Sequence, residues 1–294
     1  MTASLGRFAV PAGFARQDRP YIVCHMLTAL DGRISGPAMD TEEACAAGAD
    51  YETVNRFYAP GAWVNGRKTA AEHFTSLAAP AFAADAHARA EALADHIALR
   101  RPENCLVVLD PAGRLGWEKN FVQYAGRPKA HIVIALSEQA DPRHAAYLRD
   151  LGISVLVCGK RDIDCGLLAR KLRQCFGIRV LKVSGGGQVN WSFAREGLID
   201  ELSLVAAPVA DGLPGAPSLF DRRRGLSPNE PCAAAAGSET VMDGPVRFAL
   251  KETRILPGGS VWLRYARKGA GSGTGPEELS AAAGQGAAGG EERA

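Results

Sequence analysis

The chain has 294 residues and a formal net charge of +2 at pH 7, with charged residues making up 22% of it. Because positive and negative charges are interspersed and nearly balanced, the sequence lacks the basic footprint of a nucleic-acid-binding protein, and a nucleotide fits it better than a polynucleotide. No stretch approaches the run of about 18 apolar residues that a membrane span needs, and the N-terminus has no apolar signal-peptide core. We therefore expect a cytoplasmic protein that binds a small molecule and contacts neither nucleic acid nor membrane.

The seven cysteines give no sign of a metal site or of a disulfide framework. None forms a C-x-x-C pair or another spacing typical of zinc ligands, and most lie inside apolar stretches. We expect no bound metal. Buried, reduced thiols are expected at Cys24, Cys45, Cys105, Cys158, Cys165, Cys175 and Cys232.

Seven apolar runs are near-continuous rather than alternating, which is typical of strands covered on both faces. They span 21–30, 62–66, 105–110, 131–136, 153–159, 178–184 and 202–209. Helical patterns lie between them at 50–58, 81–99, 142–151, 164–175 and 187–196. This alternation predicts an α/β protein with a mainly parallel, doubly wound sheet.

The C-terminal part departs from this rhythm. The segments 246–256 and 260–268 flank Pro-Gly-Gly, which predicts an antiparallel hairpin added to one edge of the sheet. Residues 211–245 are rich in Pro, Gly and Ala, and we expect them to form a long loop near the site. The chain is therefore expected to divide into an N-terminal extension (1–18), one domain (19–268) and a disordered Gly/Ala-rich tail (269–294).

Three consecutive glycines, Gly185–Gly187, lie where an apolar strand runs into a predicted helix. Glycines let a ligand approach the backbone closely, and the free N–H groups at a helix N-terminus attract a phosphate. The turn lacks the Gly-Lys-Ser/Thr ending of a Walker loop. A Rossmann site does not fit either, because Asp200 and Glu201 come before the next strand rather than at its end. A phosphate cradle is favoured, and an ordinary tight turn is the alternative.

A second strand, 62–66, ends in Gly66 and opens on a helix that begins with Arg67, Lys68 and Thr69. One glycine-rich and one basic strand-to-helix turn can hold the two phosphate regions of one NADPH molecule. The guanidinium of Arg67, with Lys68 nearby, suits the 2′-phosphate, whereas the three glycines suit the pyrophosphate. The alternatives are that Thr69 caps the helix and that Lys68 is a solvated surface charge.

Together, three motifs resemble the dihydrofolate reductase superfamily, and most closely the reductase domain of the riboflavin-biosynthesis deaminase-reductases. The motifs are Ala29-Leu30-Asp31-Gly32 after the first strand, Gly66 to Thr69, and Gly185–Gly187 followed by GLIDEL and APV. The resemblance implies a dihydrofolate reductase-like fold, NADPH as the cofactor, a homodimer and an unusual, cis Gly185-Gly186 peptide. Nothing matches the H-x-E and P-C-x-x-C signature of the fused deaminase, so no deamination is expected.

The chain departs from the riboflavin reductases at three positions around the expected substrate pocket. His25 stands where those proteins carry a lysine, Ala29 where they carry a serine, and Ser184 where they carry an acidic residue. The resemblance therefore leaves the substrate open.

The resemblance implies that Asp31 orients the substrate or relays a proton, with His25 as the second candidate. The alternatives are a turn-stabilising Asp31 and a hydrogen-bonded core His25. The expected substrate contacts are Thr28, Ala29, Arg56 and Ser184, and an exposed structural arginine is the alternative for Arg56. The expected cofactor contacts are Gly66, Arg67, Lys68, Thr69, Gly185, Gly186, Gly187 and Gln188.

We expect an NADPH-dependent reductase that transfers a hydride to a C=N or C=O carbon of a small heterocyclic substrate. In the riboflavin branch this activity is that of a 5-amino-6-(5-phosphoribosylamino)uracil reductase. Two alternatives stay open. One is the reduction of a pterin or secondary-metabolite imine on the same scaffold, and the other is a non-catalytic NADP(H)-binding sensor.

Overall fold

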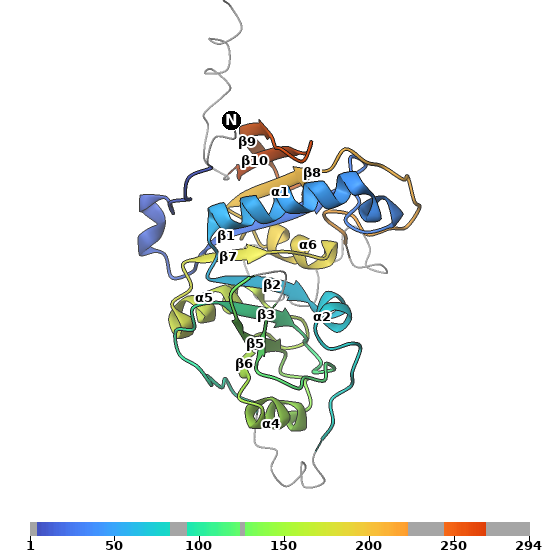
Figure 1. Cartoon of the computed structure of the whole chain (residues 1–294). Coiled ribbons are helices and arrows are strands. Elements are labelled where there is room, and N and C mark those ends of the chain that lie inside the picture. Colours follow the sequence, from blue (N-terminus) through green and yellow to red (C-terminus); the bar gives the residue numbers. More distant parts are fainter. Residues whose placement is uncertain (1–4, 83–92, 124–126, 223–243, 269–294) are drawn as a thin grey trace, which may run out of the picture.

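The computed structural model describes residues 5–82, 93–123, 127–222 and 244–268. These residues build one ten-stranded sheet (Figure 1), with strands in the order β4-β5-β3-β2-β7-β1-β8-β10-β9 and β6 paired to β5. The strands are β1 (Tyr21–Thr28), β2 (Ala62–Gly66), β3 (Cys105–Leu109), β4 (Phe121–Val122), β5 (Ala130–Leu136), β6 (Ser154–Val157), β7 (Val180–Val183), β8 (Glu201–Ala206), β9 (Phe248–Ile255) and β10 (Val261–Arg267).

The pairing of the strands confirms the predicted fold class. β7 lies between β1 and β2 and runs parallel to both, and the pairs β1–β8, β2–β3, β3–β5 and β5–β6 are also parallel. β9 and β10 form an antiparallel hairpin, and β10 attaches it to β8 at one edge. Parallel neighbours end at the same edge of a sheet, so the turns that follow β1, β2 and β7 lie close together.

Helices cover both faces of the sheet (Figure 1). The described helices are α1 (Glu42–Tyr58), α2 (Arg67–His73), α4 (Pro142–Asp150), α5 (Cys165–Phe176) and α6 (Gly187–Arg195), with short 3-10 turns at Ala12–Arg16 and Pro37–Asp40. α5 and α6 pack on one face, while α1, α2 and α4 pack on the other. Alternate residues of a strand therefore enter different layers, as β1 shows with Ile22 on the α5 side and Val23 on the α1 side.

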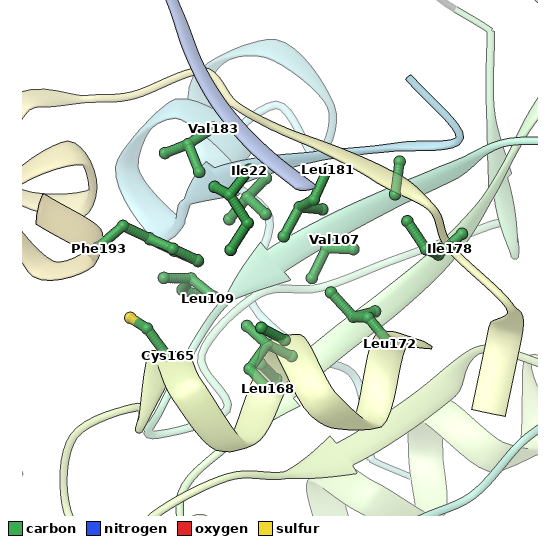
Figure 2. Packing of buried hydrophobic residues seen from close by; sticks show 14 of the residues in the cluster. Ile22, Val107, Leu109, Cys165, Leu168, Leu172, Ile178, Leu181, Val183 and Phe193 are labelled. Atoms are coloured by element: carbon green, nitrogen blue, oxygen red, sulfur yellow. The ribbon is translucent and has the colours of Figure 1, made fainter. Parts of the chain in front are cut away.

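The layer beneath α5 and α6 is the largest apolar cluster, and Figure 2 shows its packing. Leu168 and Leu172 of α5 and Phe193 of α6 point at Ile22 and Leu181 of the sheet, and all five side chains have no exposed surface. Burying such a side chain stabilises the fold by about 1.5 to 3 kcal/mol.

The prediction of a helix over 81–99 is wrong for the residues of this range that the structure describes. Residues 81–82 and 93–99 are not helical, and 83–92 lie outside the described residues. His96 instead pairs with Val155 of β6, because each backbone N–H donates to the other's carbonyl at 2.8 Å. The helical spacing of apolar residues in this segment was therefore overridden by pairing with a strand distant in sequence.

Two smaller expectations need correction. The helix expected over 50–58 is α1, and it begins earlier because the Thr41 hydroxyl caps it by accepting a hydrogen bond from Ala44 N at 3.3 Å. Cys45, expected to be buried, is exposed, and Cys175 is half-buried. Four of the remaining cysteines are buried free thiols, and Cys232 lies outside the described residues.

The flanking segments are only partly described. In the expected extension, Phe8 packs against the ring of Tyr21 at a centroid distance of 5.3 Å, and Phe8 N donates to Phe57 O. Of the expected long loop 211–245, residues 223–243 lie outside the described residues, and so does the expected tail 269–294. The described part of the loop, 211–222, runs over the ends of β1 and β7, where it bonds to Asp31 and to Gly187.

Candidate functional site

The two turns expected to bind a cofactor touch each other. Gly66, the last residue of β2, donates its N–H to the Gly185 carbonyl at 3.2 Å, and Ser184 N donates to Val64 O at 3.1 Å. This contact follows from the sheet order, because β7 pairs directly with β2. A Cβ on Gly66 would lie 2.8 Å from Val189 of α6, so a side chain there would push the two turns apart.

Two of the three glycines in the Gly185–Gly187 turn have a structural reason to lack a side chain. Gly185 has a φ of +86°, in the left-handed region that favours glycine, and a cis peptide joins it to Gly186. A Cβ on Gly187 would lie 2.3 Å from the carbonyl oxygen of Ser218. Around Gly186 the nearest atom to such a Cβ is Ile34 Cδ1, at 3.9 Å. The protein itself therefore requires two of the glycines, and Gly186 is the one that leaves free space.

The basic turn is open to solvent. Arg67 and Lys68 begin α2 and are both exposed, and Lys68 forms an i,i+4 ion pair with Glu72 at 3.9 Å. Thr69 is half-buried inside the first turn of α2, where the N-cap is Gly66 rather than a hydroxyl side chain. On the neighbouring helix α6, Gln188 is exposed beside the glycine turn.

Asp31 lies exposed at the turn after β1. Its carboxylate accepts hydrogen bonds from Arg33 N at 3.3 Å and from Gly212 N at 3.0 Å, which ties the turn to the 211–222 segment. Loss of water acts to raise its pKa, but the N–H groups of Gly212, Arg33 and Asp211 outweigh that effect and lower the pKa below its ordinary value. Asp31 is therefore ionised at neutral pH. Its hydrogen bonds stabilise the turn, which was the alternative role that the sequence offered for this residue.

The 211–222 segment connects the Asp31 turn with the glycine turn. Leu219 N donates to Gly32 O at 3.1 Å, and the Leu219 carbonyl accepts from Nδ2 of Asn190, a fully buried residue of α6, at 2.8 Å. Asp221 N donates to Gly187 O at 3.1 Å, and the Asp221 carboxylate accepts from the Ser218 hydroxyl. Sequence reasoning placed this loop near the site but could not show these contacts.

His25 is placed in the core beneath α1 and has no exposed surface. Its ring stacks on Tyr51, with centroids 4.2 Å apart. Nε2 lies 3.1 Å from the Tyr51 carbonyl, which can only accept, so Nε2 carries the proton and Nδ1 accepts from the Ser203 hydroxyl at 3.0 Å. Burial, and then the charge of Lys182, lower the pKa of His25 to about 3. The ring is therefore neutral at physiological pH.

The expected substrate contacts fall into two groups. Thr28 and Ala29 are buried at the end of β1, and Ser184 stands at the end of the neighbouring β7 with its hydroxyl oxygen buried and without a partner in the described part of the chain. Arg56 is exposed on α1 and donates to Thr53 of the same helix at 2.9 Å. The structure thus brings Thr28, Ala29 and Ser184 together at the C-terminal ends of β1 and β7. Arg56 instead bonds to a residue of its own helix, α1.

Sequence reasoning missed Lys182, which lies in β7 two residues before Ser184. It is 1% exposed, and its Nζ donates to Asn55 Oδ1 of α1 at 2.7 Å. Burial, and then the Arg127 guanidinium, lower the pKa of this amine well below its usual range, against the opposing charge of Glu52. A lysine inside the apolar run 178–184 was the available signal.

Comparison with known proteins identifies the family. The model of the RibD C-terminal domain matches residues 20–241. The chain belongs to this family. The matched range contains the three strand ends and the two touching turns described above, and it stops before the β9–β10 hairpin.

Two curated relatives match shorter parts of the chain. One, from Aquifex aeolicus, is 34% identical over 91 residues, and the other, from Methanothermobacter thermautotrophicus, is 38% identical over 93 residues. Both are named 2,5-diamino-6-ribosylamino-4(3H)-pyrimidinone 5′-phosphate reductase. The matches cover 31% and 32% of this chain, and 40% and 42% of the relatives, so the chain spans less than half the length of either relative.

Solved structures share the fold. A pyrimidine reductase-like protein from Corynebacterium diphtheriae superposes with a TM-score of 0.59 at 16% identity, over 88% of this chain and 96% of its own. A RibD structure from Acinetobacter baumannii gives a TM-score of 0.53 at 19% identity, over 85% of this chain and 58% of its own. The dihydrofolate reductase-like fold implied by the motifs is confirmed.

Two kinds of site are absent from the residues that the structure describes. Among them, no helix is both long enough and apolar enough to cross a membrane. The same residues contain no group of three or more His, Cys, Asp or Glu side chains that could hold a metal ion.

Proposed function

We propose that this chain is an NADPH-dependent reductase that converts the ribosylamino group of a pyrimidine 5′-phosphate, through its open-chain imine, into a ribitylamino group. The observation that carries the proposal is the contact between the glycine turn after β7 and the basic turn after β2, in a chain of the RibD C-terminal domain family. The names of the curated relatives support the choice of substrate class.

The residues of both turns fit an NADP(H) molecule. Gly186 leaves open space beside the first turn of α6, whose N–H groups favour an anion, and this suits the pyrophosphate. Arg67 is exposed next to this turn and offers a charged fork for the 2′-phosphate, with Lys68 beside it. Thr69 and Gln188 are the remaining polar side chains that we assign to the cofactor.

Bound NADPH supplies the hydride, and the chain must orient the substrate and provide for a proton. We assign the orienting role to Asp31, because its ionised carboxylate lies exposed at the end of β1 and can accept a hydrogen bond from a substrate N–H or from water. Thr28, Ala29 and Ser184 form the adjacent strand ends. His25 stands behind them as a neutral core side chain, because both its ring nitrogens already have partners.

A different imine substrate on the same scaffold is the second candidate. It is favoured by the departures at His25, Ala29 and Ser184, which all lie at or beside the β1 and β7 strand ends. Purified protein should be incubated with NADPH and each of two substrates: the ribosylaminopyrimidinone 5′-phosphate named for the relatives, and its deaminated uracil counterpart. We expect NADPH oxidation and a product heavier by two hydrogen atoms.

The same assay with a pterin and with other imines decides between the alternatives. Turnover of a pterin or another imine, without turnover of either pyrimidine, would move the chain to the second candidate. Tight NADPH binding with no turnover of any of these substrates would favour a non-catalytic sensor. We also propose a homodimer, which light scattering of the purified protein would test.

A further inference from the structure

Lys182 is a buried amine with little to compensate it. Within the described part of the chain, its Nζ has one hydrogen-bond partner, Asn55 Oδ1, and takes part in no ion pair. An ammonium group has three donors, so one acceptor leaves most of its lost hydration unreplaced. Such a group destabilises the fold relative to an apolar side chain of similar size, and buried charges of this kind cluster at functional sites.

The charged and titratable groups around Lys182 do not neutralise it. The Tyr51 ring of α1 lies 5.4 Å from Nζ, and this ring stacks on His25 of β1. Glu52 of α1 is the nearby carboxylate, but it pairs with Arg127, which lies three residues before β5, at 2.5 Å. The surroundings of the amine therefore contain two further basic groups and one acid that is already paired.

The amine also lies close to the candidate substrate position. Lys182 and Ser184 are two residues apart along β7, so their side chains leave the same face of the chain roughly 6 to 7 Å apart. Ser184 directly precedes the glycine turn, and its buried hydroxyl has no partner among the described residues. In the neighbouring strand, Cys24 pairs with Val183, which brings His25 level with Ser184.

We propose that Lys182 is a positioning and specificity residue of the reductase: its buried amine holds Tyr51 and Asn55 beneath the substrate and selects a substrate group that carries a carbonyl oxygen or a negative charge. The proposal rests on the proposed function. It explains why the strand keeps a buried amine where an apolar residue would stabilise the fold better.

The test compares Lys182→Met with the wild-type protein. Methionine has a similar volume and no charge, so we expect the melting temperature to stay equal or to rise. NADPH affinity should not change. The affinity for the ribosylaminopyrimidinone 5′-phosphate in the presence of NADP⁺, measured by calorimetry, should fall by about tenfold or more, and KM should rise more than kcat falls.

Lys171→Met is the matched control. Lys171 of α5 is an ion-paired lysine, whose Nζ lies 2.8 Å from Asp95 and also donates to Val157 O. Removing it should lower stability slightly and leave substrate affinity and kcat/KM at the wild-type values. The contrast between the two methionine variants separates a role at the site from the mere loss of a lysine.

The pH profile gives a readout that a purely structural lysine would not move. In the wild-type enzyme kcat/KM should fall as the pH rises through the lowered pKa of Lys182, because the amine then loses its proton. Lys182→Arg keeps its charge at high pH and should extend the plateau to more alkaline values. His25, Tyr51 and Glu52 are unchanged in this variant, so a shift of the alkaline limb of the pH profile is assigned to position 182.

Three results would overturn the proposal. Substrate affinity at the wild-type level in Lys182→Met would do so, as would a lower melting temperature with unchanged kcat/KM. Wild-type protein that binds NADPH but turns over neither pyrimidine contradicts the proposed function alone, and Lys182 is then judged by the calorimetric affinities. Wild-type protein that fails even to bind the pyrimidine overturns both proposals.

Discussion

Two buried charges lie on the α1 face of the sheet, and their surroundings differ. Glu201 of β8 has no exposed surface, and its carboxylate accepts hydrogen bonds from Tyr21, Lys251 and Arg264, the latter two at 2.7 and 2.8 Å, and a short one from Tyr58. Among the described residues, the amine of Lys182 in β7 has a single hydrogen-bond partner, Asn55 Oδ1. The Glu201 region is thus closed within the protein and joins β8 to the C-terminal hairpin, whereas the β7 region holds polar groups that the protein leaves incompletely paired.

This difference distinguishes a region that stabilises the fold from a region that is suited to bind a ligand. A buried charge with its full set of partners fixes the arrangement of strands, and its loss should be felt as instability. In the β7 region the Ser184 hydroxyl has no partner among the described residues, the Lys182 amine is poorly compensated and Gly186 is open, so the region has room and polarity for a ligand. Changes near β7 should therefore alter binding and turnover, while changes near Glu201 should alter stability.

Gly186→Val should cause the largest loss of function. Gly186 has a φ of −62°, which valine accepts, and the nearest atom to an added Cβ is 3.9 Å away, so the fold should remain. The new side chain would occupy the space assigned to the pyrophosphate, and binding of both NADPH and NADH should be lost in calorimetric titrations. Undiminished cofactor binding would leave the three glycines as an ordinary turn.

Gly187→Ala is the control for this prediction. Its Cβ would meet the Ser218 carbonyl at 2.3 Å, so the expected first effect is a displaced 211–222 segment and a lower melting temperature. The two variants should therefore differ: Gly186→Val loses cofactor binding because the ligand space is filled, whereas Gly187→Ala loses stability because the packing is disturbed.

Asp31→Asn should lower turnover while cofactor binding stays. The amide keeps one acceptor for the N–H groups of Arg33 and Gly212, so the turn should persist, but the negative charge is removed. If the carboxylate orients the substrate or relays a proton, kcat should fall by about 10² to 10⁴. Steady-state kinetics with the pyrimidine substrate would measure this fall, and wild-type turnover would reduce Asp31 to a turn residue.

Glu201→Gln should act in the opposite way. Removing the charge leaves Arg264 and Lys251 facing a neutral amide, and breaking a buried ion pair in this way costs about 3 to 5 kcal/mol of unfolding free energy. Denaturant unfolding would measure it, and kcat/KM of the folded enzyme should not change. Glu252→Gln, which removes a partly exposed partner of Arg264, is the control and should cost under about 1 kcal/mol. Equal costs would contradict the contrast between the two regions.

His25→Gln should sharpen the comparison through the pH dependence of stability. The folded pKa of His25 is about 3 and its ordinary value is 6.5, so only the unfolded chain takes up a proton as the pH falls below 6.5. The stability that the neutral ring provides is complete above pH 6.5 and is lost towards pH 3. Between pH 7 and pH 4.5, the wild-type protein should lose about 2 to 3 kcal/mol more than the glutamine variant. Parallel stability curves would show that His25 is not held neutral.

Most of the sheet could be predicted from the sequence, because strands covered on both faces have near-continuous apolar sequences. Each of the seven runs contains a strand, while β4, only two residues long, left no such signal. The helix expected at 81–99 failed since its apolar spacing says nothing about pairing with β6. A propensity read within one segment cannot include a partner that is distant in sequence.

The site could be predicted only as separate pieces. The motifs showed which residues follow each strand, and the chemistry of glycine and arginine suggested phosphate groups. The sequence could not show that β7 lies between β1 and β2, which brings the turns into contact, nor that the 211–222 segment bonds to both Asp31 and Gly187. Lys182 was missed because one lysine in an apolar run looks like a strand end until α1 is seen to cover it.

The measurement that tests the central claim most directly is the titration of NADPH and NADH into wild-type protein and Arg67→Ala. The claim is that the β2 turn binds the 2′-phosphate, which NADH lacks, while the β7 turn binds the pyrophosphate that both cofactors share. Loss of a charge-assisted contact of about 1.5 to 3 kcal/mol should weaken NADPH binding about tenfold to hundredfold and leave NADH binding unchanged. Equal weakening of NADPH and NADH would contradict the division of work between the two turns.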